Sequence, residues 1–165
     1  MSEYIWKQAD NKDAEMFFEL IKKRIAWMDD VGIRHWNILN YTEVYPLEHY
    51  IDHVNAGRLW VLKDSTCVLG GAVLYETDDF WADSPCDTAY YVHRFATDTD
   101  HKGIGREILK FIYDTAKNHG KTRIRLDCSE DNPSLNTYYE SAGYMPNGTC
   151  TDGPYKGIRR ELIIK

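Results

Sequence analysis

The fold is decided by residues 90–144, which read YYVHRFATDTDHKGIGREILKFIYDTAKNHG (90–120) and then KTRIRLDCSEDNPSLNTYYESAGY (121–144). The first part predicts a strand, a short polar loop and a helix whose apolar residues recur at nearly the 3.6-residue period. Gly103 and Gly105 lie where that helix begins, and glycine lets an anion approach the backbone closely. The first N–H groups of a helix are free and lie at the positive end of its dipole, so we expect a phosphate site there. The surrounding donors are His101, Lys102 and Arg106.

Two better-known glycine motifs do not fit this loop. A dinucleotide fingerprint would need Gly or Ala at Ile108. A P-loop would need Gly at Thr115 ahead of Gly120-Lys121-Thr122, and that triplet lies between a helix and a strand, the reverse of the P-loop order. The loop therefore predicts a phosphate site of another kind, and the alternative is a helix that begins at glycine for structural reasons alone.

The second part adds a strand and a short helix. Residues 123–127 alternate apolar and polar side chains, as a strand does. Asn132-Pro133 is typical of a helix start, with Asn as the N-cap and Pro at the first helical position. Gly143 is a natural residue to follow the last turn of that helix.

With these motifs the chain resembles the GNAT superfamily of N-acetyltransferases. That family shows a strand, a (Gln/Arg)-x-x-Gly-x-(Gly/Ala) loop, a helix and a strand, then an Asn, a Tyr seven residues later, and Gly-Phe or Gly-Tyr. The matching residues here are Gly103-Ile104-Gly105, Asn132, Tyr139 and Gly143-Tyr144. The chain departs from the pattern at Asp100, where the family has Gln or Arg, so we expect His101 or Lys102 to supply the missing donor.

The resemblance implies a binding mode for acetyl-CoA. Its pantetheine arm would pair with the backbone of His93, Arg94 and Phe95, as an added strand does. Asn132 would bond the pantetheine amides, and a backbone N–H near Phe95 would stabilise the oxyanion of the transition state. The pyrophosphate would rest on residues 101–106, which are His101, Lys102, Gly103, Ile104, Gly105 and Arg106.

The resemblance also implies catalytic roles. Tyr139 would be the general acid for the departing CoA thiolate, because a phenol keeps its proton at neutral pH, and the alternative is a tyrosine that serves the core. Tyr138 would point about 100° away around the helix and serve the structure. Asp127, five residues before Asn132, is a candidate for the base, with a structural role as the alternative. His93, Tyr91, Glu76 or a water relay are the other candidates.

The acceptor pocket is predicted to form from residues 32–46, the 77–87 loop and the last two strands. Trp36 and Trp81 would be aromatic walls, which suit an apolar group or an amine through cation–π contact. Trp36 and Tyr91 are the residues that we expect to contact the acceptor, and ordinary anchoring of loops is the alternative for each tryptophan.

Composition sets further limits. The 165 residues are expected to form a single domain, 1–165. The net charge of -6 argues against a nucleic-acid binder and mildly favours a cationic acceptor. The N-terminal stretch has no long apolar run, so neither a signal peptide nor a membrane span is expected. The four cysteines are far apart in sequence and are interpreted as reduced thiols of a cytoplasmic protein.

The rest of the chain completes a mixed α/β (α+β) architecture. Patterns predict helices over 10–31 and 47–56, an irregular stretch over 33–46, and an exposed loop over 77–87. Gly70-Gly71 is expected to mark a bulge. The resemblance implies a central, mixed, mostly antiparallel sheet of about seven strands flanked by about four helices, with a splayed strand pair that holds acetyl-CoA. The other predicted strands cover 4–8, 58–63, 67–75, 145–151 and 157–164.

These observations predict an acetyl-CoA-dependent N-acetyltransferase that acts, without a metal, on a primary amine of a small molecule or peptide. The alternative is a noncatalytic acyl-CoA-binding sensor, and a third possibility is a phosphate-binding α/β domain unrelated to CoA. No nucleic acid or membrane is expected as a partner. An exposed final strand would offer a way to form a homodimer.

Overall fold

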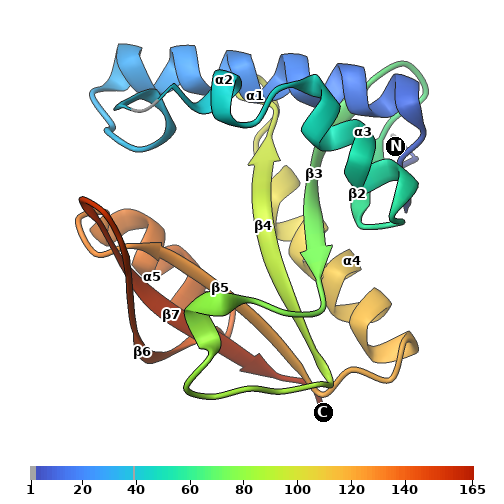
Figure 1. Ribbon diagram of the computed structural model, residues 1–165. Coiled ribbons are helices and arrows are strands. Elements are labelled where there is room, and N and C mark those ends of the chain that lie inside the picture. The colour runs from blue at the N-terminus through green and yellow to red at the C-terminus, as the bar shows by residue number, and fades with distance from the viewer. Residues whose placement is uncertain (1–2, 39) are drawn as a thin grey trace. The chain divides into compact units, whose positions relative to one another are not determined.

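The computed structural model describes residues 3–38 and 40–165, and its seven strands form one sheet in the order β1-β2-β3-β4-β5-β7-β6 (Figure 1). β4 and β5 are parallel, whereas β1–β2, β2–β3, β5–β7 and β6–β7 are antiparallel. The predicted mixed, mostly antiparallel seven-stranded sheet is therefore confirmed. The strands are β1 (Ile5–Gln8), β2 (Leu59–Lys63), β3 (Val68–Tyr75), β4 (Ala89–Thr97), β5 (Arg123–Ser129), β6 (Met145–Asp152) and β7 (Tyr155–Ile163).

In the described part of the chain five α-helices accompany the sheet, where about four were predicted. The additional helix is the single turn α2, inside the stretch predicted to be irregular. One turn is too short for an apolar period to reveal it. The α-helices are α1 (Asn11–Val31), α2 (Tyr41–Val44), α3 (Leu47–Asn55), α4 (Ile104–Asn118) and α5 (Pro133–Ser141), and the 3₁₀ turns are η1 (Trp36–Ile38) and η2 (Asp79–Trp81).

The chain divides into two compact units. The first comprises the chain up to Leu74 together with Arg94–Phe111, and the second comprises Tyr75–His93 and Ile112–Lys165. In the first unit α1 and α3 lie side by side (Figure 1). The rings of Phe17 on α1 and Tyr50 on α3 meet edge to face, with centroids 5.8 Å apart, and both side chains are fully buried.

The long helix α1 begins and ends as its sequence predicts. Asp10 is the N-cap: its side chain accepts a hydrogen bond from the N–H of Asp13, and the Asp13 side chain accepts one from the N–H of Asp10. Gly32 ends the helix with a φ of 76°, a left-handed conformation that favours glycine. The prediction of a helix over 10–31 is confirmed to within one residue.

Both glycines of β3 lie where a side chain would clash with its neighbours, Gly70 with β4 and α4, and Gly71 with β2 and α1. A Cβ on Gly71 would lie 2.5 Å from the carbonyl oxygen of Trp60 and 3.1 Å from the ring of Phe17. The β2–β3 register shifts between Leu62 and Lys63, which face Gly70 and Val68 respectively. The predicted bulge is thus present, and it begins beside Gly70.

In the second unit the final strand is not an edge strand. β7 pairs with β5 from Arg123↔Ile163 to Ser129↔Gly157, and it also pairs with β6 along its other side. The expectation of an exposed final strand is wrong, because the β6–β7 hairpin folds back and inserts its second strand beside β5. The exposed edge at this end of the sheet belongs to β6.

Candidate active site

The predicted anion loop of the first unit presents its donors to solvent. α4 begins at Ile104, directly after Gly103, whose φ of 82° is left-handed. His101, Lys102 and Arg106 are exposed. The side chain of Ile104 is buried in the core, so Ile104 can serve a ligand through its backbone alone. The loop has the exposed cations and the helix start that an anion site needs.

A lysine from α1 neutralises the acidic residue that departs from the family pattern. The Nζ of Lys23 lies 2.6 Å from Oδ2 of Asp100 and 2.8 Å from Oδ1 of Asp98. Asp98 in turn accepts hydrogen bonds from the N–H of Asp100 and from the ring of His101. Sequence reasoning did not identify Lys23 as a residue of the site. The pattern of a helix does not show that an exposed lysine contacts a loop more than 70 residues away.

β4 contains an unusual backbone conformation at Arg94. Its φ of 54° is the one left-handed value recorded for a residue other than glycine in the described part of the chain. Such a conformation costs free energy and is typical of a functional site. Its guanidinium lies over the ring of Tyr45, 3.7 Å from the centroid, and 5.7 Å from that of Tyr41. These contacts hold the side chain and leave the backbone of residues 93–95 as the predicted pantetheine partner.

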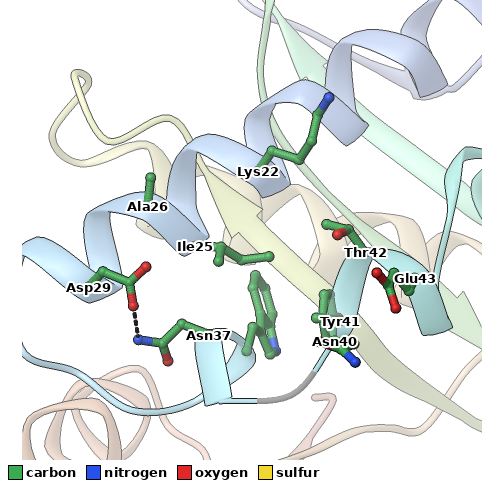
Figure 2. Close-up of a pocket in the computed structure, with 10 residues that line it drawn as sticks. Lys22, Ile25, Ala26, Asp29, Asn37, Asn40, Tyr41, Thr42 and Glu43 are labelled. Carbon is green, nitrogen blue, oxygen red and sulfur yellow. Dashed lines mark hydrogen bonds between the residues drawn. The ribbon is translucent and has the colours of Figure 1, made fainter.

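A cavity of about 360 Å³ lies in the first unit, between α1, η1 and α2 (Figure 2). Asp29 from α1 and Asn37 from η1 meet at its rim, where the amide nitrogen donates a 2.7 Å hydrogen bond to the carboxylate. Glu43 from α2 adds a second carboxylate. Trp36 lines the cavity and stacks on Tyr41 with ring centroids 4.9 Å apart. The predicted acceptor residue Trp36 therefore lies beside carboxylates that would attract an ammonium group.

In the second unit the start of α5 is built as predicted. Oδ1 of Asn132 accepts a 3.1 Å hydrogen bond from the N–H of Leu135, and Pro133 follows at the first helical position. The cap orients the Asn132 amide, whose nitrogen is the donor that the predicted pantetheine contact uses.

Asn136, one turn further along α5, was not found in the sequence. Its amide nitrogen donates to the carbonyl oxygens of Ser129 and Asn132, at 2.9 and 3.0 Å. Its carbonyl oxygen accepts from the Arg160 side chain at 3.1 Å and from the Cys128 thiol at 3.2 Å. These bonds fix α5 against β5 and β7. An asparagine inside a helix gives no sequence signal for such a network.

Tyr139 lies on the buried side of α5. It is 8% exposed, and its ring packs edge-on against Tyr138 and Tyr144, with centroids 5.5 and 5.9 Å away. Burial raises the pKa of Tyr139 well above its ordinary value. The phenol therefore keeps its proton at neutral pH, which is what a general acid requires.

Asp127, the first candidate for the base, is held by a tyrosine. The hydroxyl of Tyr155 donates a 2.6 Å hydrogen bond to Oδ2 of Asp127. Burial, together with the Asp127 carboxylate, raises the pKa of Tyr155 far above its ordinary value. One oxygen of Asp127 is thus occupied, and its assignment as the base stays a prediction.

His93 pairs with a carboxylate that the sequence did not single out. Its Nε2 lies 2.6 Å from Oδ2 of Asp78, and its ring meets the Tyr75 ring edge to face at 5.0 Å. Burial opposes ionisation of Asp78, but the hydrogen bond and the charge of His93 outweigh it and hold the pKa of Asp78 below its ordinary value. Glu76, another candidate, pairs with Lys121 at 2.7 Å.

The loop over 77–87 is largely exposed, as predicted, but it is anchored by one buried residue. Its Trp81 is 1% exposed and lies between two guanidinium groups, those of Arg125 at 4.4 Å and Arg159 at 4.6 Å from its ring centroid. Arg159 also donates to the carbonyl oxygen of Phe80 at 2.9 Å. The sequence did not predict that Trp81 is buried. The loop is mostly polar, and the two arginines that contact Trp81 come from strands far along the chain.

Tyr91 lies in the same buried cluster. It is 3% exposed, and its hydroxyl accepts a 3.0 Å hydrogen bond from Arg125. This position favours a packing role for Tyr91, and its predicted contact with the acceptor stays a prediction.

Comparison with known proteins decides the family. The model of the Acetyltransferase (GNAT) family matches residues 25–144. The chain belongs to this family. The match covers the loop at 101–106, Asn132 and Tyr139, so the resemblance drawn from those motifs is confirmed, and this GNAT chain is an acetyltransferase.

Individual relatives agree with the GNAT assignment. The chain is 25% identical to the Bacillus subtilis (strain 168) protein "Uncharacterized N-acetyltransferase YesJ", over 93% of this chain and 88% of that protein. It superposes on a GNAT acetyltransferase from Listeria monocytogenes with a TM-score of 0.77 at 21% identity, covering 96% of this chain and 95% of the other. PaiA N-acetyltransferase from Thermoplasma acidophilum, solved in complex with coenzyme A, gives a TM-score of 0.76 at 16% identity, covering 98% and 99%. The two structural likenesses establish the fold.

Two further observations concern this GNAT chain. Within residues 3–38 and 40–165, His, Cys, Asp and Glu side chains form no group of three or more that would hold a metal ion. Over the same residues, the helices are too short or too polar to cross a bilayer.

Proposed function

We propose that the protein transfers an acetyl group from acetyl-CoA to a primary amine of a small molecule or peptide. The observation that carries the proposal is Tyr139, a buried phenol that holds its proton and lies seven residues after the capping Asn132 in a GNAT chain. A sensor that only bound acyl-CoA would not need a proton donor at this position.

Residues of each unit fit the demands of the donor. The first unit contributes the left-handed Gly103, the start of α4 and the exposed donors His101, Lys102 and Arg106, which suit a diphosphate. It also contributes the Arg94–Phe95 backbone, which we assign to the pantetheine arm and the oxyanion. The second unit contributes the His93 backbone, the Asn132 amide and Tyr139.

The parallel register of β4 and β5 supports the predicted splayed strand pair. The register joins Ala89, Tyr90 and Tyr91 to Arg123, Ile124 and Arg125, respectively. β5 runs on to Ser129, and its later residues are paired with β7 on the other side. We assign the β4-facing side of that later stretch to the donor.

Acetyl-CoA supplies a thioester, and the chain supplies proton transfers around it. The amine nitrogen forms a bond to the acetyl carbon, and the bond from that carbon to sulfur breaks. Tyr139 gives its proton to the departing sulfur, and the nitrogen of the new amide releases a proton that restores Tyr139. One further proton, that of the original ammonium, leaves to water through a base.

The acceptor is proposed to be cationic. The cavity of the first unit carries the carboxylates of Asp29 and Glu43 and the stacked ring of Trp36. Carboxylates and aromatic faces both attract an ammonium group. The net charge of -6 also favours a cationic acceptor.

The test is a binding and turnover experiment. Calorimetry measures acetyl-CoA binding, and release of free thiol is then followed with polyamines, amino acids, aminoglycosides and peptides with a free N-terminal amine. We expect micromolar binding and thiol release with at least one amine. Binding without transfer to any of them would favour the sensor, and binding of another nucleotide in place of acetyl-CoA would favour an unrelated phosphate-binding domain.

A further inference from the structure

A histidine and a buried aspartate form a pair in the second unit that the proposed proton donor does not use. Nε2 of His93 lies 2.6 Å from Oδ2 of Asp78. The side chain of Asp78 is 9% exposed and that of His93 is 21% exposed. The carboxylate is therefore shielded, whereas the imidazole keeps access to a substrate.

Asp78 is held in place from its other side. Its Oδ1 accepts a 2.9 Å hydrogen bond from the N–H of Phe80, which caps η2. The turn that follows is anchored by Trp81 between Arg125 and Arg159. The carboxylate that faces His93 thus belongs to a fixed turn and cannot follow the imidazole if the ring moves.

This geometry determines the tautomer of neutral His93. A carboxylate accepts hydrogen bonds, so the ring nitrogen beside it, Nε2, must carry the proton. The lone pair then lies on Nδ1. A histidine held by a carboxylate through one nitrogen, with a lone pair on the other, is the arrangement in which imidazole acts as a general base.

The other candidates for the base are side chains whose oxygen atoms already take part in hydrogen bonds or ion pairs. Asp127 accepts the hydroxyl of Tyr155 at 2.6 Å, and Glu76 pairs with Lys121 at 2.7 Å. Tyr91 accepts from Arg125 and lies in the core. Of these four residues, His93 combines partial exposure with a ring nitrogen whose lone pair has a fixed direction.

We propose that His93 is the general base, which takes a proton from the acceptor ammonium at Nδ1, and that Asp78 is the positioning residue that holds the ring. The inference rests on the proposed N-acetyltransferase function. The ammonium loses one proton to Nδ1, the neutral amine attacks the acetyl carbon, and the imidazolium later returns its proton to water. Tyr139 separately gives a proton to the sulfur and regains one from the new amide, so His93 handles the ammonium proton alone.

The surroundings of the pair contain few groups that titrate near neutral pH. Tyr75 of β3 meets the imidazole edge-on. The thiol of Cys150 on β6 interacts electrostatically with Asp127, Asp78 and Arg159, and burial raises its pKa to about 12.

Three variants test the proposal. His93→Gln keeps an N–H near the position of Nε2 but has no lone pair in place of Nδ1. Asp78→Asn keeps an oxygen for the cap of η2 and removes the charge. Asp114→Asn is the control, because Asp114 is an exposed carboxylate of the same unit on α4, and its replacement removes the same charge. Each is assayed from pH 6 to pH 10 with the panel amine that the wild type acetylates fastest.

We expect His93→Gln to lower kcat about 100-fold at pH 7, and this deficit to shrink as the pH rises and the amine loses its proton unaided. Asp78→Asn should lower kcat about tenfold, and Asp114→Asn should match the wild type. Acetyl-CoA affinity should not change in any of them. A loss in His93→Gln that is equal at every pH, or no loss, would overturn the proposal.

A second measurement does not depend on turnover or on the folding of a variant. Nitrogen-15 NMR of the wild-type histidine rings should show that neutral His93 is protonated at Nε2 and unprotonated at Nδ1. A neutral ring with its proton on Nδ1 would overturn the assignment. The two proposals fail differently. A wild type that acetylates no amine contradicts the proposed function, whereas an active wild type with an unaffected His93→Gln contradicts the base alone.

Discussion

At the scale of single residues, side chains outside the family motif compensate for the position at which this chain departs from it. Lys23 is the clearest case, because it pairs with Asp98 and Asp100 beside a loop that is assigned to a diphosphate. Without Lys23, two carboxylates would stand beside that loop with no neutralising lysine. The acid at the position where the family has Gln or Arg is therefore tolerated through a residue of α1.

Lys23→Ala is expected to weaken acetyl-CoA binding about two- to fivefold, the range for partly exposed charges. The effect should fall as salt is added, because exposed charges are screened. S-acetylpantetheine, which has no pyrophosphate, should bind the variant and the wild type equally. Lys22→Ala is the control, since Lys22 pairs with Glu19 instead. Equal losses for both thioesters would show that Lys23 acts on the fold and not on the anion.

At the scale of elements, α5 is positioned by the bonds of Asn136 to β5, β7 and its own N-cap. Removing that side chain leaves the buried guanidinium of Arg160 without this acceptor. An unsatisfied buried donor costs about 1–3 kcal/mol.

Asn136→Ala should therefore lower the free energy of unfolding by about 2 kcal/mol, measured by urea denaturation. Ser134→Ala, at an exposed position of the same helix, should change it by less than about 0.5 kcal/mol. Equal stability of the two variants would remove the structural role assigned to Asn136.

The start of α1 contains a buried ion pair with a defined pH dependence. Asp13 is 1% exposed and lies 2.6 Å from Nζ of Lys63 and 3.1 Å from that of Lys7. Burial opposes its ionisation, but its hydrogen bonds with Lys63, the backbone of Asp10 and Lys7 prevail and lower the pKa of Asp13 to about 2. Because the folded-state pKa lies below the ordinary value, the stabilisation is complete above about pH 4 and is lost as the pH falls toward 2.

Asp13→Asn should lower the free energy of unfolding by about 2 kcal/mol at pH 7. The difference from the wild type should narrow in urea titrations at pH 4 and pH 3. Glu15→Gln, at an exposed position on the same helix, should show neither effect. A difference that stays constant from pH 7 to pH 3 would contradict the assigned pKa.

The elements that the sequence predicted well are those with a period or a cap. α1 has its Asp10 cap and its Gly32 end, and the helix at 133–141 has Asn132 and Pro133. What the sequence did not reveal depends on contacts between distant residues: Lys23 with Asp100, Asp78 with His93, and Trp81 between two arginines. Turns of three or four residues, such as α2 and η2, are too short to show a period.

At the scale of the whole molecule, the match to the GNAT family includes the predicted site residues of both units. The family match spans residues 25–144, which include parts of both compact units. Within that span the first unit carries the anion loop, and the second carries His93, Asn132 and Tyr139. We propose that these groups bind one co-substrate, acetyl-CoA, and that His93 and Tyr139 carry out the proton transfers of the reaction.

The most direct test compares Tyr139→Phe with Tyr138→Phe, which removes the neighbouring hydroxyl on the same helix. Acetyl transfer at pH 7 should fall about 100-fold or more in Tyr139→Phe and stay near the wild-type rate in Tyr138→Phe. Both variants should bind acetyl-CoA within twofold of the wild type. A Tyr139→Phe variant that transfers acetyl groups at the wild-type rate would contradict the central claim.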